Sequence, residues 1–545
     1  MAVTMRVVYW PSMLRIRLLR FLELLLLAAT LVAAAQPPKI VNNNGHYQLL
    51  VDGQPYFVLG AQINNSSSWP DTLPAVWPAL EAMHVNTAEA PVYWEQLEPQ
   101  PGTFDFSTVD DLVRGARQHN LRLVLLWFGT WKNGQMHYAP DWVKTNPAKY
   151  PRMIDANGEP IDVLSANSPA NQAADQNAFI ALMRHLRELD SDQHTILFIQ
   201  VENESGAIGT VRDFSPAADR EFNGPVPAQL VSALHKQPGT WPQVFGHEAD
   251  EYFQAYYQSR YINSIAAAGK KEFPIPMYVN VWVSYPVAAL PERRVSVPGL
   301  NYPSGGAVQK MIDLWKAMAP AIDVIGPDIY SNDSDFYREI LNTYNRPDNA
   351  LWIPETGQND VDAHYFFYAL GDGAIGFSPF GIDWTGWTLP HGEAPKLHTE
   401  NYALLSPMDK QIAELTSTGK LKTAVEEPGH AEAEIDFGPW QATVAFGFPQ
   451  RDGTKPPGTK DNHGRVLIGQ LAPDEFLVTG FDASVSFHLP GRLPGKRMQI
   501  LRAEQGVYQD GNWKPQRILN GDQTDRGLIF KSSSPQVVHI KLGKF

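Results

Sequence analysis

Two glutamates follow apolar, strand-like runs of the sequence. The run of residues 196–201, Ile-Leu-Phe-Ile-Gln-Val, continues into Glu202, Asn203 and Glu204, and the run of residues 351–354 ends at Glu355. Carboxyl groups at the carboxyl ends of two strands can face each other when the strands belong to one barrel. Such a pair suits acid–base chemistry, because one group can stay protonated while the other stays ionised.

Hydrolysis of a glycosidic bond is a reaction that needs such a pair. One carboxyl protonates the leaving oxygen, and the other attacks the anomeric carbon or activates water. A single acidic residue is more often a surface group or a helix cap, and the chain has 58 Asp and Glu. The two motifs together favour catalysis by Glu204 and Glu355. Strict strand alternation puts Glu202 on the same face as Glu204, so the pattern alone does not choose the acid.

Eight apolar runs alternate with segments of helical periodicity along most of the chain. The runs are residues 57–62, 87–94, 121–127, 196–202, 275–282, 322–330, 351–355 and 374–379. This alternation predicts the α/β class, and eight strands are the number that closes a (β/α)8 TIM barrel. Strands four and seven, which carry the two motifs, lie on opposite sides of the mouth of such a barrel. A doubly wound open sheet is the alternative, but no Gly-rich dinucleotide loop supports it.

The pattern changes after a helix predicted near residues 399–416. Residues 426–430, Glu-Glu-Pro-Gly-His, are typical of a linker, and strand-like runs with Asp-Gly and Asn-Gly turns follow them. We expect a catalytic barrel with an N-terminal hairpin over residues 36–425. We expect a smaller all-β, sandwich-like domain over residues 430–545. That domain could bind sugar, but support of the barrel is the favoured interpretation.

The first 35 residues have the pattern of an export signal. Four arginines precede an apolar stretch at residues 24–32, and residues 33–35, Ala-Ala-Ala, offer a cleavage site. The apolar stretch is short for a bilayer span. We expect a signal peptide over residues 1–35, a protein exported to the periplasm or the cell exterior, and no stable membrane insertion after cleavage. An uncleaved membrane anchor is the alternative.

The composition excludes several other chemistries. The 545 residues include no Cys, which rules out disulfides, thiol nucleophiles and Cys-ligated zinc. The net charge of −14 disfavours nucleic acid as a partner. His247 and Glu248 lack the second His of a zinc-protease helix, and no phosphate-binding loop is present. We therefore expect a carbohydrate substrate, no metal and no cofactor.

The motif at residues 200–206, Gln-Val-Glu-Asn-Glu-Ser-Gly, resembles the acid/base signature of glycoside hydrolase family 35, the β-galactosidases of the clan A barrels. The resemblance implies that Glu204 is the acid/base, that Asn203 hydrogen-bonds the sugar 2-hydroxyl, and that Glu355 is the nucleophile. Further similarity lies at residues 86–106, 140–142 and 506–522, the last resembling the β domain of a bacterial subgroup. The family likeness implies a retaining exo-β-galactosidase that removes terminal β-D-galactosyl residues from oligo- or polysaccharides.

Four aromatic residues near predicted strand ends are candidates for substrate binding. In clan A enzymes a tyrosine near the end of strand six holds the nucleophile, which points to Tyr330; an ordinary pocket or core aromatic is the alternative. Trp127, Trp131 and Trp384 could line the pocket or stack on sugar, or could pack the barrel.

Some strand ends depart from the common family pattern. Residues 60–64, residues 127–131 and Glu95 differ at positions that commonly touch the terminal galactose, so the sugar specificity stays open. One alternative is another exo-β-glycosidase. A second is a xyloglucan-trimming β-galactosidase acting on plant cell-wall polysaccharide fragments. A third, from a different class, is a non-catalytic carbohydrate-binding envelope protein.

Overall fold

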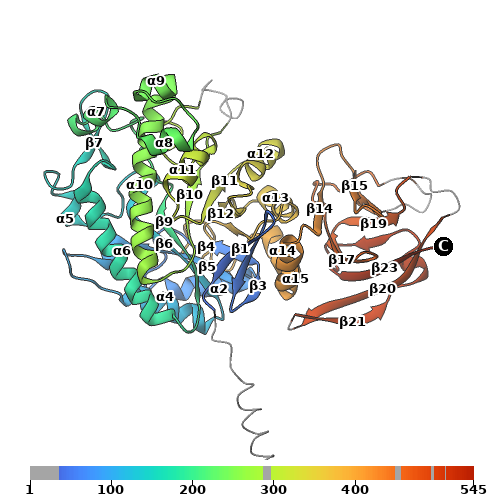
Figure 1. Ribbon diagram of the computed structural model, residues 1–545. Helices are drawn as coiled ribbons and strands as arrows, with labels where there is room; N and C mark the ends of the chain where they lie inside the picture. Colours follow the sequence, from blue (N-terminus) through green and yellow to red (C-terminus); the bar gives the residue numbers. More distant parts are fainter. Residues whose placement is uncertain (1–35, 286–295, 449–453, 455, 492–495, 510) are drawn as a thin grey trace, which may run out of the picture.

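Eight parallel strands form a closed barrel in the N-terminal part of the chain (Figure 1). The computed structural model describes residues 36–545 except for 286–295, 449–453, 455, 492–495 and 510, so the predicted signal peptide lies outside the described residues. The strands, in their order around the barrel, are β10 (Met277–Trp282), β11 (Val324–Ile329), β12 (Trp352–Thr356), β13 (Gly376–Pro379), β4 (Val58–Gln62), β5 (Thr87–Tyr93), β6 (Arg122–Lys132) and β9 (Ile196–Asn203). The predicted barrel is confirmed.

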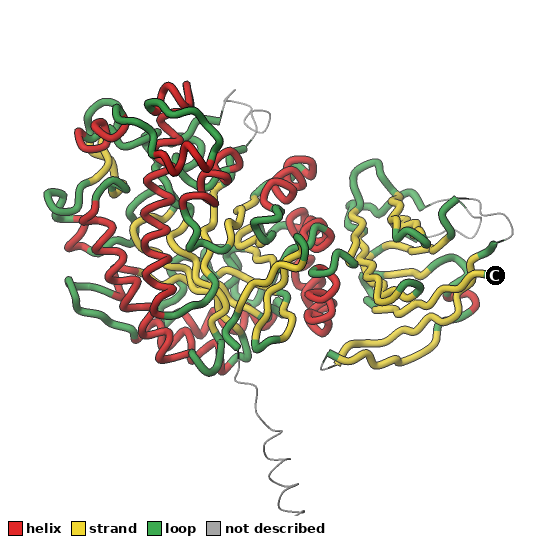
Figure 2. Tube along the Cα trace, in the orientation of Figure 1, coloured by secondary structure: helices red, strands yellow, loops and turns green. Residues whose placement is uncertain are grey.

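Helices surround this barrel (Figure 2). The longer ones are α2 (Leu73–Ala82), α4 (Ser107–Gln118), α6 (Pro169–Asp190), α10 (Ala249–Glu272), α11 (Ile312–Met318), α12 (Ser334–Tyr344), α13 (Asp360–Gly371), α14 (Lys396–Leu405) and α15 (Asp409–Thr416). α4 shows why such segments are helical and face the strands. Its buried residues Val109, Leu112, Val113 and Ala116 recur at three- and four-residue spacing, so one apolar stripe meets the barrel.

Short elements fill the connections after β5, β6 and β9. They are α3 (Trp94–Leu97), α5 (Asp141–Lys144), the hairpin of β7 (Arg152–Ile154) and β8 (Pro160–Leu164), α7 (Pro216–Phe222), α8 (Ala228–Ala233) and α9 (Trp241–Phe245). Most of these connections follow the carboxyl ends of strands, where a barrel builds its functional face.

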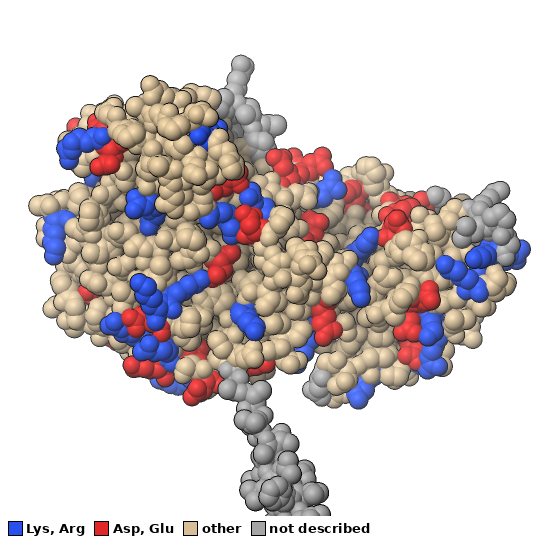
Figure 3. Space-filling model, viewed as in Figure 1, with Lys and Arg blue, Asp and Glu red and all other residues tan. Residues whose placement is uncertain are grey.

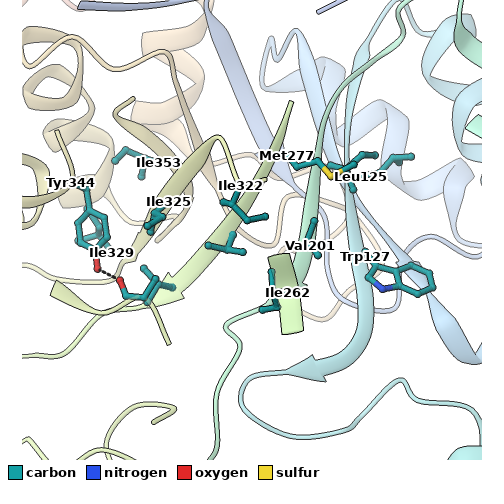
Figure 4. Packing of buried hydrophobic residues seen from close by; sticks show 14 of the residues in the cluster. Leu125, Trp127, Val201, Ile262, Met277, Ile322, Ile325, Ile329, Tyr344 and Ile353 are labelled. Carbon is teal, nitrogen blue, oxygen red and sulfur yellow. Dashed lines mark hydrogen bonds between the residues drawn. The ribbon is translucent and has the colours of Figure 1, made fainter. Parts of the chain in front are cut away.

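Two layers of apolar side chains pack the barrel. Alternate residues of β6 belong to different layers. Val124 and Phe128 lie in the inner cluster, and Leu125 and Trp127 lie in the outer one. Figure 4 shows Trp127 in the outer layer, with Val201 of β9 and Ile262 of α10. A three-stranded sheet, β1 (Lys39–Asn43), β2 (His46–Val51) and β3 (Gln54–Tyr56), adds Leu49 and Val51 to the inner cluster.

The C-terminal part is built from two antiparallel sheets, as predicted. One sheet has the order β14 (Leu421–Val425), β17 (Arg465–Ala472), β18 (Glu475–Phe481), β23 (Val537–Lys544), β20 (Met498–Gln509) and β21 (Asn512–Ile518). The other has the order β15 (Glu432–Asp436), β16 (Gln441–Phe446), β19 (Ala483–His488) and β22 (Leu528–Phe530). Between them lies a second apolar core that includes Trp440, Phe476 and Phe487.

The boundary between the two parts differs from the prediction. β14 lies within the predicted barrel segment, yet it pairs with β17 of the C-terminal sheet. Glu426, predicted to belong to a linker, is buried and accepts hydrogen bonds from Thr459 and Gly464. These bonds fix the connection, so the C-terminal domain begins at β14.

The barrel and the C-terminal sheet share one apolar core. Leu421, Leu467 and Leu477 of the sheet belong to the same buried cluster as the outer layer of the barrel. Arg465 of β17 is fully buried, and its Nε donates to Asn401 Oδ1 of α14 at 2.7 Å. The two domains are therefore joined by packing and by a buried polar contact.

The face of the molecule seen in Figure 3 is of mixed charge. Acidic and basic side chains are interspersed over both domains on the face seen in Figure 3. None of the helices in the described ranges is long and apolar enough to cross a membrane.

Candidate active site

The end of β9 has an irregular backbone that separates Glu202 from Glu204. Both residues have left-handed φ angles, 63° and 42°, on either side of Asn203. Each such conformation costs a non-glycine residue about 1–3 kcal/mol, so the surrounding contacts must hold it. Glu202 Oε2 accepts from Trp131 N at 2.7 Å, and its carboxyl meets Asp175 of the outer helix α6. Glu204 lies instead with the carboxyl groups of the mouth. Because of this break in alternation, Glu204 and not Glu202 lies with the other carboxyl groups of the mouth, so Glu204 is the candidate acid.

Three buried carboxyl groups meet at the carboxyl ends of β9, β11 and β12. One oxygen from each of Glu204, Asp328 and Glu355 lies within 4.8 Å of the others. The two predicted catalytic residues are therefore brought together, and Asp328 is a third member that sequence reasoning missed. Its position two residues before the end of the sixth predicted strand is the signal that could have found it.

Hydrogen bonds from neighbouring strands hold this cluster. Tyr330 Oη donates to Glu355 Oε1 at 2.7 Å, which is the contact predicted for this tyrosine. Asn280 of β10 ties two members together: its Nδ2 donates to Asp328 Oδ2 at 2.7 Å, and its Oδ1 accepts from Glu204 N at 2.9 Å. The Asn280 amide thus fixes the backbone of Glu204 relative to the Asp328 carboxyl.

A buried lysine binds the predicted sugar-binding asparagine. Lys132 Nζ, at the end of β6, donates to Asn203 Oδ1 at 2.9 Å. Asn203 Nδ2 is buried without a hydrogen-bond partner among the described residues. The asparagine thus keeps its donor available for a ligand. Lys132 was missed because the predicted strand stops at residue 127, whereas β6 continues to Lys132 through an irregular register.

Burial raises the pKa values of two of the three carboxyl groups. Burial, helped by the negative charge of Glu355, raises the pKa of Glu204 to about 7, and Lys132 opposes the shift. Burial and the charges of Glu355 and Glu204 raise the pKa of Asp328 well above its usual range. Glu204 is therefore a proton donor at and below neutral pH.

Activity that depends on the Glu204 proton should fall as the pH rises through about 7. The group must be protonated to donate, so the active form is fully present well below that pKa and is lost above it. The basic limb of kcat/KM, measured on a glycoside with a poor leaving group, checks this. Thermal unfolding at each pH controls for stability. Constant activity up to about pH 9 would contradict the assignment.

Replacement of Tyr330 by Phe should lower kcat/KM by about 10- to 100-fold, because a hydrogen bond to a charged group is worth about 1.5–3 kcal/mol. The variant removes the donor to Glu355 and keeps the ring. Tyr47→Phe is a matched control, since Tyr47 Oη also makes a 2.7 Å hydrogen bond, to Pro347 O, at the N-terminal sheet. Equal effects of the two substitutions on kcat/KM would contradict a specific role of Tyr330 in the reaction.

The cluster is also the place where a cation could bind. In the described part of the chain it is the one group of three or more His, Asp or Glu side chains with ligand atoms this close. However, burial raises the pKa values of Glu204 and Asp328, which favours protons on the very groups a cation would need ionised. The expected absence of a metal and of a cofactor stays a prediction.

The other predicted aromatic residues lie differently. Trp127 and Trp131 belong to the outer apolar layer, which favours the alternative that they pack the barrel over a place in the pocket. Both are fully buried: Trp127 Nε1 donates to Asp175 of α6, and the Trp131 ring packs against Tyr261 of α10. Trp384 is half-buried in the loop after β13, where its Nε1 donates to Glu393 O. Its role in sugar binding stays a prediction.

Two segments of the chain match family models. Residues 66–266 match the Beta-galactosidase model of glycoside hydrolase family 42, and residues 398–531 match a domain of unknown function, DUF5597. The first segment includes Asn203 and Glu204 and ends before Asp328 and Glu355. Family 42 differs from family 35, so the likeness holds at the level of β-galactosidases, and the assignment to family 35 stays a prediction.

Similar proteins include several β-galactosidases. A beta-galactosidase of Xanthomonas manihotis is 32% identical over 168 residues, which are 29% of this chain and 25% of the relative. Beta-galactosidase 11 of Arabidopsis thaliana is 26% identical over 169 residues, 29% of this chain and 18% of the relative. The matched segment therefore spans a quarter or less of each relative.

Solved structures of β-galactosidases resemble the chain only distantly. The enzyme of Bacillus circulans sp. alkalophilus is 10% identical with a TM-score of 0.49, over 89% of this chain and 99% of that one. The enzyme of the psychrophilic Marinomonas ef1 is 12% identical with a TM-score of 0.45, over 66% and 61%. The barrel assignment rests on the closed strand order of this chain itself.

Proposed function

We propose that this chain is a glycoside hydrolase whose catalytic pair is Glu204 and Glu355. The observation that carries the proposal is the meeting of their carboxyl groups within 4.8 Å at the mouth of the barrel. The environments of the two groups differ, because burial raises the pKa of Glu204 to about 7 while Tyr330 donates to Glu355. This difference supplies one acid and one nucleophile. The β-galactosidase match over residues 66–266 supports the same class.

More particularly, we propose a retaining exo-β-galactosidase. Retaining enzymes hold the two carboxyl groups about 5–5.5 Å apart and inverting enzymes about 6.5–9.5 Å apart, so the short separation supports retention. Glu355 attacks the anomeric carbon while Glu204 protonates the leaving oxygen. Glu204 then takes a proton from the water that releases galactose. Asn203 donates to the 2-hydroxyl in this proposal, which is supported by the absence of a partner for its Nδ2 among the described residues.

Two loops at the carboxyl ends of barrel strands carry exposed aromatic rings. Trp69 and Trp387, 48% and 70% exposed, lie in the loops that follow β4 and β13. Asn64 holds these loops together through hydrogen bonds to Asp383 and Thr388. Flat aromatic faces suit the apolar faces of sugar rings, so terminal residues of oligo- or polysaccharides are the proposed substrates.

Export of the protein is also a proposal. It rests on the arginines, the apolar stretch and the Ala-Ala-Ala site of residues 1–35. A glycosidase that acts on polymers too large to enter a cell would work in the periplasm or outside the cell. Cell fractionation and N-terminal sequencing of the recovered protein check the proposal. An intact leader on the protein recovered from the cytoplasm would contradict it.

Hydrolysis of an aryl β-galactoside, followed by NMR of the first-formed sugar, tests substrate class and stereochemistry together. The proposed mechanism gives β-galactose first, before mutarotation. α-Galactose as the first product would contradict retention but leave a glycoside hydrolase. Sugar binding without turnover of any glycoside would favour the non-catalytic envelope protein.

A different exo-β-glycosidase is the second candidate. The strand ends at residues 60–64 and 127–131 differ from the common family pattern, and they motivate this alternative. A panel of aryl glycosides with galactose, glucose, xylose and fucose, together with galactosylated xyloglucan oligosaccharides, separates the two. The galactosidase proposal requires the highest kcat/KM on a β-galactoside.

A further inference from the structure

A second pair of acidic side chains lies behind the acid/base residue. Glu202 stands two residues before Glu204 on β9, and Asp175 comes from α6, the helix outside the barrel. Both side chains are buried, with 0% and 1% exposure for Asp175 and Glu202. The proposed reaction uses neither of them, and a buried pair of acids is costly unless its oxygens are satisfied.

The segment at residues 127–131 of β6 satisfies most of these oxygens. Trp127 Nε1 and Thr130 Oγ1 donate to the two oxygens of Asp175, at 2.9 and 2.6 Å. Trp131 N donates to Glu202 Oε2 at 2.7 Å. The segment that makes these contacts, residues 127–131, is the one that departs from the family pattern. Its tryptophans pack outside the pocket.

One oxygen remains, and it faces the other acid. Glu202 Oε1 has no hydrogen-bond donor among the described residues, and it lies beside Asp175, since both Glu202 Oε1 and Asp175 Oδ1 are within 3.0 Å of the point where a Cβ of Gly129 would stand. Two buried carboxyl groups side by side can hydrogen-bond to each other only when one of them carries a proton. Gly129 permits the close packing, because a Cβ there would lie 2.8 Å from Glu202 Oε1 and 2.3 Å from Trp127 Nε1.

The pair anchors the strained end of β9. The left-handed φ angles of Glu202 and Glu204 bracket Asn203, and the pairing of β6 with β9 shifts register between Trp127 and Lys132. Regular alternation would turn Glu202 to the side opposite Val201, which belongs to the outer layer with Trp127. Glu202 turns instead toward α6, and its hydrogen bonds there hold the end of β9 in the irregular, left-handed conformation.

We propose that Glu202 and Asp175 share one proton and act as positioning residues that hold Glu204 in place for proton transfer. This inference rests on the proposed function. Burial and the neighbouring carboxylate raise the pKa of Glu202 well above its usual range, which agrees with a proton held between the two. Tyr261 also faces the pair, through Thr130.

Kinetics of Glu202→Leu and Glu202→Gln on two β-galactosides test the proposal. One substrate has a good leaving group, 2,4-dinitrophenol, and the other has a poor one, methanol. The first step, which kcat/KM reports, suffers from a displaced acid only when the leaving group needs its proton, so kcat/KM of the Leu variant should fall about 100-fold on the methyl galactoside and less than about fivefold on the dinitrophenyl one. Gln can keep the bonds to Trp131 and Asp175, so it should stay within about threefold of the wild type on both.

Controls separate positioning from folding and from the proposed function itself. Glu426→Leu removes another buried, hydrogen-bonded glutamate, from the C-terminal domain, and should show no dependence on the leaving group. If Glu202→Leu does not fold, Asp175→Asn, which cannot accept from both Trp127 and Thr130, should show the same pattern at about tenfold. Equal losses on both substrates, or no loss, overturn the positioning role. No turnover by the wild type on any glycoside overturns the proposed function instead.

Discussion

Replacement of Glu355 by Gln is expected to lower kcat by about four orders of magnitude or more, on every substrate that the wild type cleaves. The amide keeps the shape and can still meet the Tyr330 hydroxyl, but it cannot form the bond to the anomeric carbon. The loss should not depend on the leaving group, because the first step fails with any of them. Steady-state kinetics on aryl β-galactosides measure the effect.

Two controls make this result specific. Glu339→Gln changes an exposed glutamate of α12 and should leave kcat unchanged. Circular dichroism and thermal unfolding should show the fold of Glu355→Gln intact. A 2-deoxy-2-fluoro-galactoside should label the wild type at Glu355 and leave the variant unlabelled. A label on another residue, or substantial activity in the variant, would remove Glu355 from the role of nucleophile.

Replacement of Glu204 by Ala should give a loss that depends on the substrate. General acid catalysis contributes about 10²- to 10⁴-fold, so a galactoside with a poor leaving group should lose that much. With 2,4-dinitrophenol as the leaving group, the first step needs no proton, and the galactosyl-enzyme should accumulate. Azide, which needs no general base, should then restore turnover and give β-galactosyl azide. Kinetics with and without azide measure both effects.

The azide experiment also distinguishes Glu204 from Glu202. Glu202→Ala should not be rescued by azide, because that carboxyl lies on the helix side of β9 and not in the mouth. Rescue of Glu202→Ala but not of Glu204→Ala would reverse the assignment. An α-galactosyl azide would show that azide attacks the free substrate and not a covalent intermediate.

The barrel and its two glutamates were predictable because the signals are local. Each strand is a short apolar run, and a carboxylate directly after such a run lies at the functional end of the barrel. The rule did not find Asp328, because Asp328 lies inside the sixth run, residues 322–330, and not directly after it. Tyr330 was found through family resemblance, and its bond to Glu355 agrees with that expectation.

Local patterns failed where the backbone departs from regular geometry. The left-handed residues at the end of β9 and the register shift beside β6 cannot be read from residue types, since Glu at positive φ is unusual. The side on which Trp127 lies depends on the register of β6, and a slip of one residue reverses it. The start of the C-terminal domain was placed too late, because β14 forms its hydrogen bonds with β17, whose residues pair from Val425 with Arg465 to Leu421 with Gly469, far along the chain.

The core shared by the barrel and the C-terminal sheet has a consequence for how the protein loses its structure. Leu421, Leu467 and Leu477 are buried with barrel residues, and the charge of Arg465 is enclosed at the junction beside Asn401. Separation of the domains would expose this apolar surface and leave Asn401 without its donor. We therefore expect the two domains to melt as one cooperative unit, and a protease acting on the folded protein to release neither of them as an independent module.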